Sequence, residues 1–234
     1  ELQQFASVAS HDLKEPLRKI QIFSSVIREK HLNNTPEATD SINRVIESAA
    51  RMSVLINDLL SYSRLSMEQL FTPTDLNLVV GDIVKDLELQ IAEKNARIKC
   101  GNIPILEVVA GQMRQVFQNL LSNSLKFTDS QSRPEITISA ERVSGLSFEA
   151  AASEEGEWCR ITLTDNGIGF DEMYLQKIFT IFQRLNAREQ YEGTGIGLAI
   201  VKKIVEKHSG IITAKSRPGQ GASFIMVLPV RQTH

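Results

Sequence analysis

Cysteine is scarce in this sequence, whose 234 residues include only Cys100 and Cys159. The two lie far apart, without a CxxC pair or neighbouring histidines. This spacing indicates neither a zinc site nor a disulfide framework, and it is typical of a reducing compartment. We therefore expect a cytoplasmic segment, which is compatible with a membrane tether in a more N-terminal part of a longer protein.

Long apolar runs and an excess of one charge are also lacking. No stretch approaches the roughly 20 apolar residues of a membrane helix, and no segment has the pattern of a signal peptide. Because 26 Lys and Arg face 28 Asp and Glu, the formal net charge is -2, and no global basic field would attract nucleic acid or anionic lipid. We expect contact with neither a nucleic acid nor a membrane. The 42% hydrophobic content is typical of a globular protein.

Apolar residues in the first 60 positions recur at alternating steps of four and three, which is the spacing of helices that pack together. The stripe in the first helix contains Leu13, Ile20, Phe23 and Ile27, and the stripe in the second contains Ile42, Ala49, Met52, Ile56 and Leu59. These stripes predict a helical hairpin. The second helix carries further apolar residues outside its stripe: Val45, Ile46, Ala50, Leu55 and Leu60. One partner helix cannot cover so wide a face, so we predict that two hairpins form a dimeric four-helix bundle.

The helical pattern breaks between Leu65 and Pro73, and we place a domain boundary there. Residues 1–66 form the hairpin, residues 67–76 a linker that ends in a cap for the next helix, and residues 77–234 a second domain. In the second domain, helical stretches alternate with β-rich ones, which predicts an α/β sandwich. The helical stretches are 77–93, 111–126, 172–179 and 197–208, and the β-rich ones are 97–99, 105–109, 135–143, 158–164, 211–216 and 222–229.

His11 lies roughly opposite the apolar stripe of the first helix, so we expect its imidazole to face solvent. Asp12 follows it, and a carboxylate there could hold the ring in one tautomer and accept its proton while the other ring nitrogen attacks an electrophile. The alternative is that both are ordinary solvated side chains of a helix.

Asn119 and Asn123 are four residues apart and share one face of a predicted helix, whose other face is apolar. Two carboxamide oxygens on one face suit Mg²⁺, which usually binds one or two protein oxygens together with phosphates and water. Lys126, on the next turn, could meet a phosphate. Exposed helical asparagines are also common without any ligand.

Two glycine-containing segments lie in the second domain, one after the predicted strand 158–164 and one at the start of the predicted helix 197–208. In the first, Asp165 comes directly after the strand predicted over 158–164 and is followed by Gly167 and Gly169, so the carboxylate could accept a hydrogen bond from an amino group such as that of adenine. The alternative is a tight turn with a capping Asp. The second, residues 193–197, opens a helix whose N–H groups could bind phosphates. Its spacing matches neither the Rossmann nor the P-loop motif.

Phe179 and Phe182 precede a polar stretch, residues 186–192, and together these suggest a hinge and a lid over a nucleotide. The alternative for the aromatics is plain packing in a core. Arg184 could contact a phosphate or be solvated.

In their order along the chain, these motifs closely resemble those of the sensor histidine kinases of two-component signalling, in the form linked to PAS-type or phytochrome-type sensors. Residues 10–18 resemble the phospho-acceptor box of that family. The segments at Gln115, Asp165, Phe179 and Gly193 resemble its N, G1, F and G2 boxes.

The resemblance implies a dimerisation and histidine-phosphotransfer hairpin followed by a GHKL-type (Bergerat) ATP-binding domain, a mixed sheet covered by helices on one face. His11 would take the γ-phosphoryl group of ATP with Asp12 as base, Lys126 and Arg184 would assist, and Asn123 would hold Mg²⁺. The group would then pass to an aspartate of a response-regulator receiver domain. The residues that the resemblance assigns to the nucleotide are Asn119, Asn123, Lys126, Phe127, Asp165, Gly167, Gly169, Phe182, Gly193, Thr194, Gly195, Gly197 and Leu198.

The resemblance also implies a sensor domain upstream of this segment. Glu15 stands where many members have the Thr or Asn that serves to dephosphorylate the regulator, so phosphatase activity does not follow. Two other classes stay open at this point. One is an ATPase of the gyrase, mismatch-repair or chaperone branch, which would not need His11, and the other is a dimerisation module that binds a nucleotide without transferring phosphate.

Overall fold

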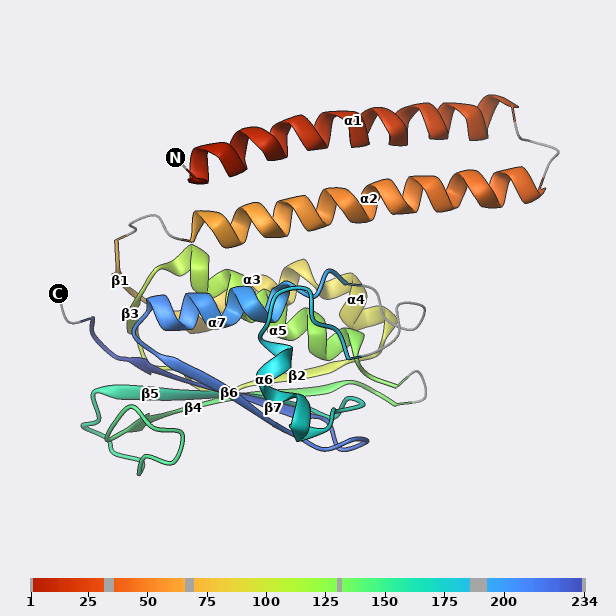
Figure 1. Ribbon diagram of the computed structural model, residues 1–234. Helices are drawn as coiled ribbons and strands as arrows, with labels where there is room; N and C mark the ends of the chain where they lie inside the picture. The colour runs from red at the N-terminus through yellow and green to blue at the C-terminus, as the bar shows by residue number, and fades with distance from the viewer. Residues whose placement is uncertain (1, 32–35, 66–69, 130–131, 186–192, 233–234) are drawn as a thin grey trace. The chain divides into compact units, whose positions relative to one another are not determined.

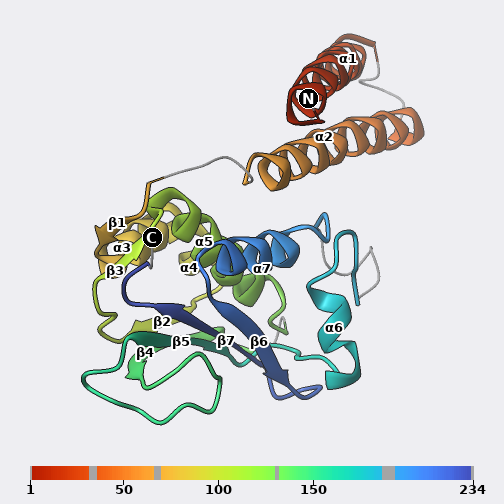
Figure 2. The ribbon, with the colours of Figure 1, turned by 60° about the vertical axis from the view of Figure 1, so that its left-hand side comes forward.

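The structure is a computed structural model of the chain, and it describes residues 2–31, 36–65, 70–129, 132–185 and 193–232 (Figures 1 and 2). The chain divides into two compact units, residues 1–67 and residues 68–234. The first consists of two long helices, α1 (Leu2–His31) and α2 (Pro36–Arg64). None of the helices in the described ranges combines the length and the apolarity needed to cross a membrane.

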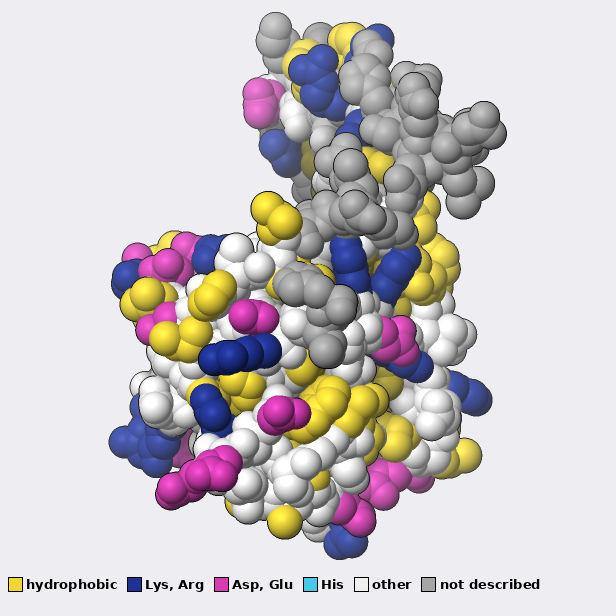
Figure 3. All heavy atoms as spheres, turned by 90° about the vertical axis from the view of Figure 1, so that its left-hand side faces the viewer, with side chains coloured by type: hydrophobic (Ala, Val, Ile, Leu, Met, Phe, Trp, Pro, Cys, Tyr) yellow, Lys and Arg dark blue, Asp and Glu magenta, His cyan; other side chains and the backbone are white. Residues whose placement is uncertain are grey.

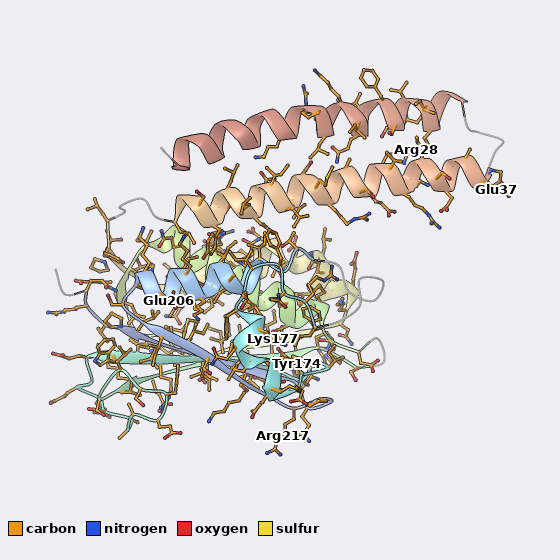
Figure 4. All side chains as sticks on the ribbon, in the orientation of Figure 1. Arg28, Glu37, Tyr174, Lys177, Glu206 and Arg217 are labelled. Atoms are coloured by element: carbon orange, nitrogen blue, oxygen red, sulfur yellow. The ribbon has the colours of Figure 1, made fainter. Side chains whose placement is uncertain are left out.

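The two helices of the hairpin pack through small and medium-sized residues. Leu17 and Ser24 are buried on α1, and Ala49 and Leu60 are buried on α2. Near the far end of the hairpin, the Arg28 guanidinium lies between the helices (Figure 4) and donates to Asn43 Oδ1 at 3.2 Å. A helical hairpin, as predicted, is therefore present.

The stripes expected to form the seam of the hairpin were assigned wrongly in large part. Ile20, Phe23 and Ile27 on α1 are exposed, Phe23 by 64%, and so are Met52 and Leu59 on α2. Conversely, Leu60, which we expected on the outer face, is buried. Heptad spacing identifies apolar stripes, but it does not decide which of two neighbouring stripes faces the partner helix. The bulkier stripe faces outward in this hairpin.

A five-stranded mixed sheet forms one layer of the second unit. Its strand order is β2 (Arg97–Cys100), β4 (Glu135–Val143), β5 (Trp158–Asp165), β7 (Ala222–Pro229) and β6 (Ile211–Ser216). The β2–β4 pair is parallel and the other pairs are antiparallel. Asp165 occupies the last register position of the central strand β5, opposite Ile136 on one side and Ala222 on the other.

Helices cover one face of this sheet, as the predicted fold class requires (Figure 1). They are α3 (Leu76–Asp86), α4 (Glu88–Glu93), α5 (Ala110–Lys126) and α7 (Gly197–Lys207). The core between the layers is apolar, because the buried sides of α5 and α7 meet inward-pointing residues that alternate along the strands, as in β4. Its members include Phe117, Leu120, Ile136, Ile161, Ile200 and Ile204.

Several elements differ from their predicted extents. The helix expected over 77–93 is two helices that meet at Leu87, and the one expected over 172–179 is a 3-10 turn, η1 (Glu172–Tyr174), followed by α6 (Leu175–Ile178). The linker contains a strand, β1 (Thr72–Thr74), that pairs with β3 (Leu106–Val108). The expected cap of the next helix is confirmed, because Asp75 Oδ1 accepts from Asn77 N at 2.9 Å.

Charged side chains of both signs are interspersed on the face of the second unit shown in Figure 3. This distribution fits the small formal net charge of -2. An ion attracted to the surface must therefore be held by a local arrangement of groups.

Candidate functional site

Asp165 is the centre of a dense hydrogen-bond network at the end of β5. Its Oδ1 accepts from the backbone N–H groups of Gly167 at 2.9 Å and Ala222 at 3.2 Å. Its Oδ2 accepts from the hydroxyl of Ser124 on α5 at 2.9 Å. The carboxylate thus has a fixed orientation, because donors from a turn, a strand and a helix hold it from three sides.

Burial raises the pKa of the Asp165 carboxyl above its ordinary value, since burial disfavours the charged form. The hydrogen bonds from Gly167, Ser124 and Ala222 act in the opposite direction because they stabilise the charged form. An acceptor held in this way, at the edge of the core, suits a donor such as an amino group on a ring.

Gly167 and Gly169 are required where the chain approaches itself. A Cβ on Gly167 would lie 2.6 Å from the carbonyl oxygen of Phe127, and one on Gly169 would lie 2.1 Å from the carbonyl oxygen of Arg217. Gly169 also has a φ of 63°, a conformation that favours glycine. Contacts within the protein therefore already account for both glycines. Ile168 N, between them, donates to Phe127 O at 2.8 Å, and this bond joins the turn to the end of α5.

The C-terminal half of α5 carries Asn119, Asn123 and Lys126, all half-buried. Asn119 Nδ2 donates to the carbonyl of Gln115 at 2.9 Å, and its Oδ1 lies against Gly197, where an added Cβ would be only 2.7 Å away. The Lys126 ammonium lies 4.1 Å from the centroid of the Phe127 ring and 2.9 Å from the Cβ position of Gly193. Lys126 and Asn119 thus both lie beside the segment that opens α7.

The segment 193–197 leads into the N-terminus of α7. Gly195 has a φ of 74° and packs against the carbonyl of Gln183, with 2.9 Å from its Cβ position to that oxygen. Ile196 is the N-cap residue and makes no side-chain capping bond, and Leu198 is half-buried in the first turn. The first N–H groups of a helix lack acceptors within the helix, and they carry the positive end of its dipole. This end of α7 and the Lys126 ammonium together suit an anion.

A short segment after α6 is joined to this glycine-rich stretch. Phe182 N donates to Gly195 O at 3.0 Å, and Arg184 Nη1 donates to Gly193 O at 3.0 Å. Phe182 is 59% exposed and has a φ of 63°, while Phe179 is half-buried. Nearby, the Lys177 ammonium lies 5.7 Å from the Tyr174 ring centroid (Figure 4). The stretch 186–192, in which we expected a lid, lies outside the described residues.

The structure brings most of the predicted nucleotide residues to one end of the helical layer, where α5 ends and α7 begins (Figure 1). A hydrogen-bond acceptor, Asp165, lies on one side of the C-terminal part of α5, and a group of positive and N–H donors lies on the other. Such a site can bind a molecule with an amino group at one end and phosphates at the other. His11 and Asp12 belong to α1 in the other unit, and their side chains lie outside the described residues.

Two buried polar residues, Ser124 and His208, were not predicted from the sequence. Ser124 is 2% exposed on a helix face that otherwise carries Leu120, Leu121 and Leu125, so a hydroxyl on an apolar stripe was the available signal. His208 stands at the end of the helical stretch predicted over 197–208. It is fully buried, and its Nε2 accepts from Val109 N, the residue before α5, at 3.0 Å. No pattern in the sequence indicated that bond.

Two family models match the chain, one over each unit. The model of the His Kinase A (phospho-acceptor) domain matches residues 1–68, and that of the histidine kinase-, DNA gyrase B- and HSP90-like ATPases matches residues 109–232. The phytochrome-like protein Cph1 of Synechocystis sp. is 37% identical over 232 residues, which are 98% of this chain and 29% of Cph1. The chain thus spans less than a third of that curated relative.

Solved structures share the fold. Full-length ShkA in complex with AMPPNP covers 98% of this chain with a TM-score of 0.71 and 23% identity, and the match spans 46% of ShkA. Histidine kinase ThkA in complex with the response regulator TrrA covers 97% of this chain with a TM-score of 0.64 and 22% identity, over 61% of that chain. The phospho-acceptor model on the hairpin separates this chain from the gyrase and chaperone branches of the ATPase family. The chain belongs to the sensor histidine kinases.

Proposed function

We propose that this chain is the catalytic core of a protein histidine kinase, which transfers the γ-phosphoryl group of ATP to His11 and then to an aspartate of a receiver domain. One observation carries the proposal. A phospho-acceptor hairpin occurs in the same chain as an ATPase-family unit that has an acceptor for an amino group at one end of its site and donors for phosphates at the other. ATP has an amino group at one end and a triphosphate at the other, so it fits both ends at once.

The adenine amino group would donate to Asp165 Oδ2, which is held in place by its other contacts. The triphosphate would bind the first N–H groups of α7, at Gly197 and Leu198, together with the Lys126 ammonium. Thr194 and Asn119 border the same segment. Arg184, bonded to the carbonyl of Gly193, would keep this segment in the shape that receives the phosphates. The helix dipole and the ammonium then oppose the negative charge of the ligand.

Mg²⁺ fits the donor set of this site. The described residues contain no group of three His, Cys, Asp or Glu that could hold a metal ion. A carboxamide oxygen combined with phosphates and water is a usual environment for this ion, and we propose that Asn123, one turn before Lys126, supplies that oxygen. When bound, the ion would neutralise charge that develops on the phosphates.

In the transfer step, an imidazole nitrogen of His11 would form a bond to the γ-phosphorus while the bond between that phosphorus and the β–γ bridging oxygen breaks. ADP would leave with the electron pair, and the proton of the other ring nitrogen would pass to Asp12. Phosphoryl transfer of this kind depends mainly on positioning and electrostatic stabilisation. The linker between the two units, with β1 at its end, would allow the two sites to meet.

A second copy of the chain is the partner that we propose for the hairpin. The outer stripe, defined as Ile20, Phe23 and Ile27 on α1 with Val45, Met52 and Leu59 on α2, is exposed in the single hairpin. Soluble monomers seldom expose a contiguous apolar surface of this kind. Two such hairpins can cover each other's outer stripe in a symmetric four-helix bundle.

We propose two further partners, a receiver domain and a sensor domain upstream of this segment. The ThkA complex contains a response regulator, and the match to Cph1 covers only 29% of that phytochrome-like protein. ATP and receiver domains meet in the cytoplasm, where we place this segment.

Incubation with γ-labelled ATP and Mg²⁺ tests the proposal. The wild-type chain and His31→Gln, a matched control at the end of the same helix, should become labelled, and His11→Gln should not. The label should be acid-labile and base-stable, as a phosphoramidate is. Equal labelling of His11→Gln would contradict the proposal. Release of inorganic phosphate without any labelling would favour the ATPase branch.

A further inference from the structure

We propose that Ser124 is a positioning residue that determines adenine specificity, because its hydroxyl orients the Asp165 carboxylate and leaves one acceptor position for the 6-amino group. This inference rests on the proposed function. Ser124 is not among the residues that the resemblance assigns to the nucleotide. Ser124 lies one residue after Asn123 on α5, in a face made of leucines, and its position there calls for a specific reason.

Burial makes the hydroxyl of Ser124 costly unless it is bonded. The residue is 2% exposed, and a hydroxyl removed from water without a partner is unfavourable. Its partner is Asp165 Oδ2 at 2.9 Å. A hydroxyl can donate only one hydrogen, and an ionised carboxylate can only accept, so the direction of this bond is settled.

The acceptor positions of Asp165 can be counted. Each carboxylate oxygen offers about two lone-pair positions. Oδ1 accepts from Gly167 N and Ala222 N, so both of its positions are used. Oδ2 accepts from Ser124, which leaves it one further position. Because three donors from three elements fix the plane of the group, that position has a definite direction, and it suits one N–H of an exocyclic amine.

Without the Ser124 hydroxyl, the carboxylate would keep the two donors on Oδ1 but lose the one on Oδ2. The group could then turn about the bond to its Cβ, and the direction of the free acceptor position would become less defined. A purine without a 6-amino group does not use that position. The affinity for ATP should therefore fall while the affinity for such an analogue stays the same, whereas a general loss of stability would weaken the binding of both nucleotides alike.

Calorimetric titration of the full chain with ATP and with purine riboside triphosphate, which lacks the 6-amino group, tests the inference. The wild type should bind ATP more tightly than the analogue. Ser124→Ala should lose about three- to tenfold in ATP affinity, with little change for the analogue. Ser223→Ala is the matched control, since its hydroxyl is 2.9 Å from that of Thr164 beside Asp165 and does not bond to the carboxylate. The control should keep the wild-type ratio of affinities.

Ser124→Thr keeps the hydroxyl and should keep the discrimination between the two nucleotides. Ser124→Cys fills the same volume with a much weaker donor and should lose it, which provides the test if Ser124→Ala does not fold. An unchanged ratio of affinities in Ser124→Ala or Ser124→Cys would overturn the inference while leaving the proposed function intact. A wild-type chain that binds neither nucleotide would instead contradict the proposed function.

Discussion

His208 should make the stability of the α/β unit depend on pH near neutrality. The ring is fully buried at the end of α7, where Nε2 accepts from Val109 N at 3.0 Å and Nδ1 donates to Ile204 O at 2.8 Å. Phe71 meets it edge-on, with 5.2 Å between the ring centroids. Both nitrogens are thus engaged by a neutral ring. A second proton on Nε2 would break the bond to Val109.

Burial lowers the pKa of His208 below its ordinary value of 6.5. In the unfolded chain the ring takes up a proton as the pH falls through about 6.5, whereas in the folded chain it does so only at lower pH. The contribution of His208 to stability is therefore fully present above that value and is lost as the pH falls toward the folded pKa. Between the two values, one proton lowers the free energy of unfolding by up to about 1.4 kcal/mol per pH unit.

Denaturation in guanidinium chloride, followed by fluorescence, would measure this effect. Trp158 is the single tryptophan of the chain and lies on β5, so its signal reports on the α/β unit. His208→Gln supplies a neutral comparison. At pH 7.5 the variant should be less stable by about 1–3 kcal/mol, because the bond to Val109 N is weakened or lost. The difference in free energy of unfolding between the wild type and His208→Gln should become smaller from pH 7.5 to pH 5.5, since only the wild type loses stability through this ring.

Groups shared by both proteins cancel in this comparison, including Asp165 and the other histidines. If the wild type and His208→Gln lose stability in parallel over this range, His208 does not change its protonation on unfolding. That result would contradict the role of its two hydrogen bonds in keeping the buried ring neutral.

Asp165→Asn should weaken binding of ATP by about 10- to 150-fold and binding of a purine triphosphate without the 6-amino group far less, and equal losses in a titration would place Asp165 elsewhere. Phe23→Glu and Met52→Glu should each convert the dimer to monomers in sedimentation equilibrium. The control Val54→Glu should not, because Val54 is exposed about 200° further round α2 than Met52, and a monomeric wild type would contradict the role of the outer stripe. Gln112→Met should raise the free energy of unfolding by about 1–2 kcal/mol in the Trp158 assay, because Nε2 and Oε1 of Gln112 are buried without a hydrogen-bond partner among the described residues. A lower free energy of unfolding in this variant would show that these two atoms do form hydrogen bonds.

Short-range patterns in the sequence accounted for most of the elements. The β-rich stretches located β4 and β5, and the cap expected at the end of the linker marked the start of α3. These features depend on residues only a few positions apart, so they can be assigned without knowing the fold. The break of the helix at Leu87 and the pairing of β1 with β3 could not be predicted from the sequence, because both arise where distant segments pack.

The candidate site, too, combines features of local sequence with contacts between distant segments. The order of the motifs and the spacing of Asn119 and Asn123 pointed to the segments of the candidate site. The contacts between those segments could not be read from spacing. Asn119 packs against Gly197, and Ser124 bonds to Asp165 across 41 positions.

Local patterns were thus enough to predict the helical hairpin, the α/β class and the segments of the candidate site, because periodicity, capping and motif order depend on residues that are close in the chain. Three arrangements emerged only in the folded chain: the bulkier stripes of the hairpin face outward, Ser124 bonds to Asp165, and His208 bonds to Val109 across 99 positions. Each of these arrangements requires two distant elements to pack at one register and one rotation. Many rotations are compatible with the same local pattern, and the packing of the whole core selects one of them.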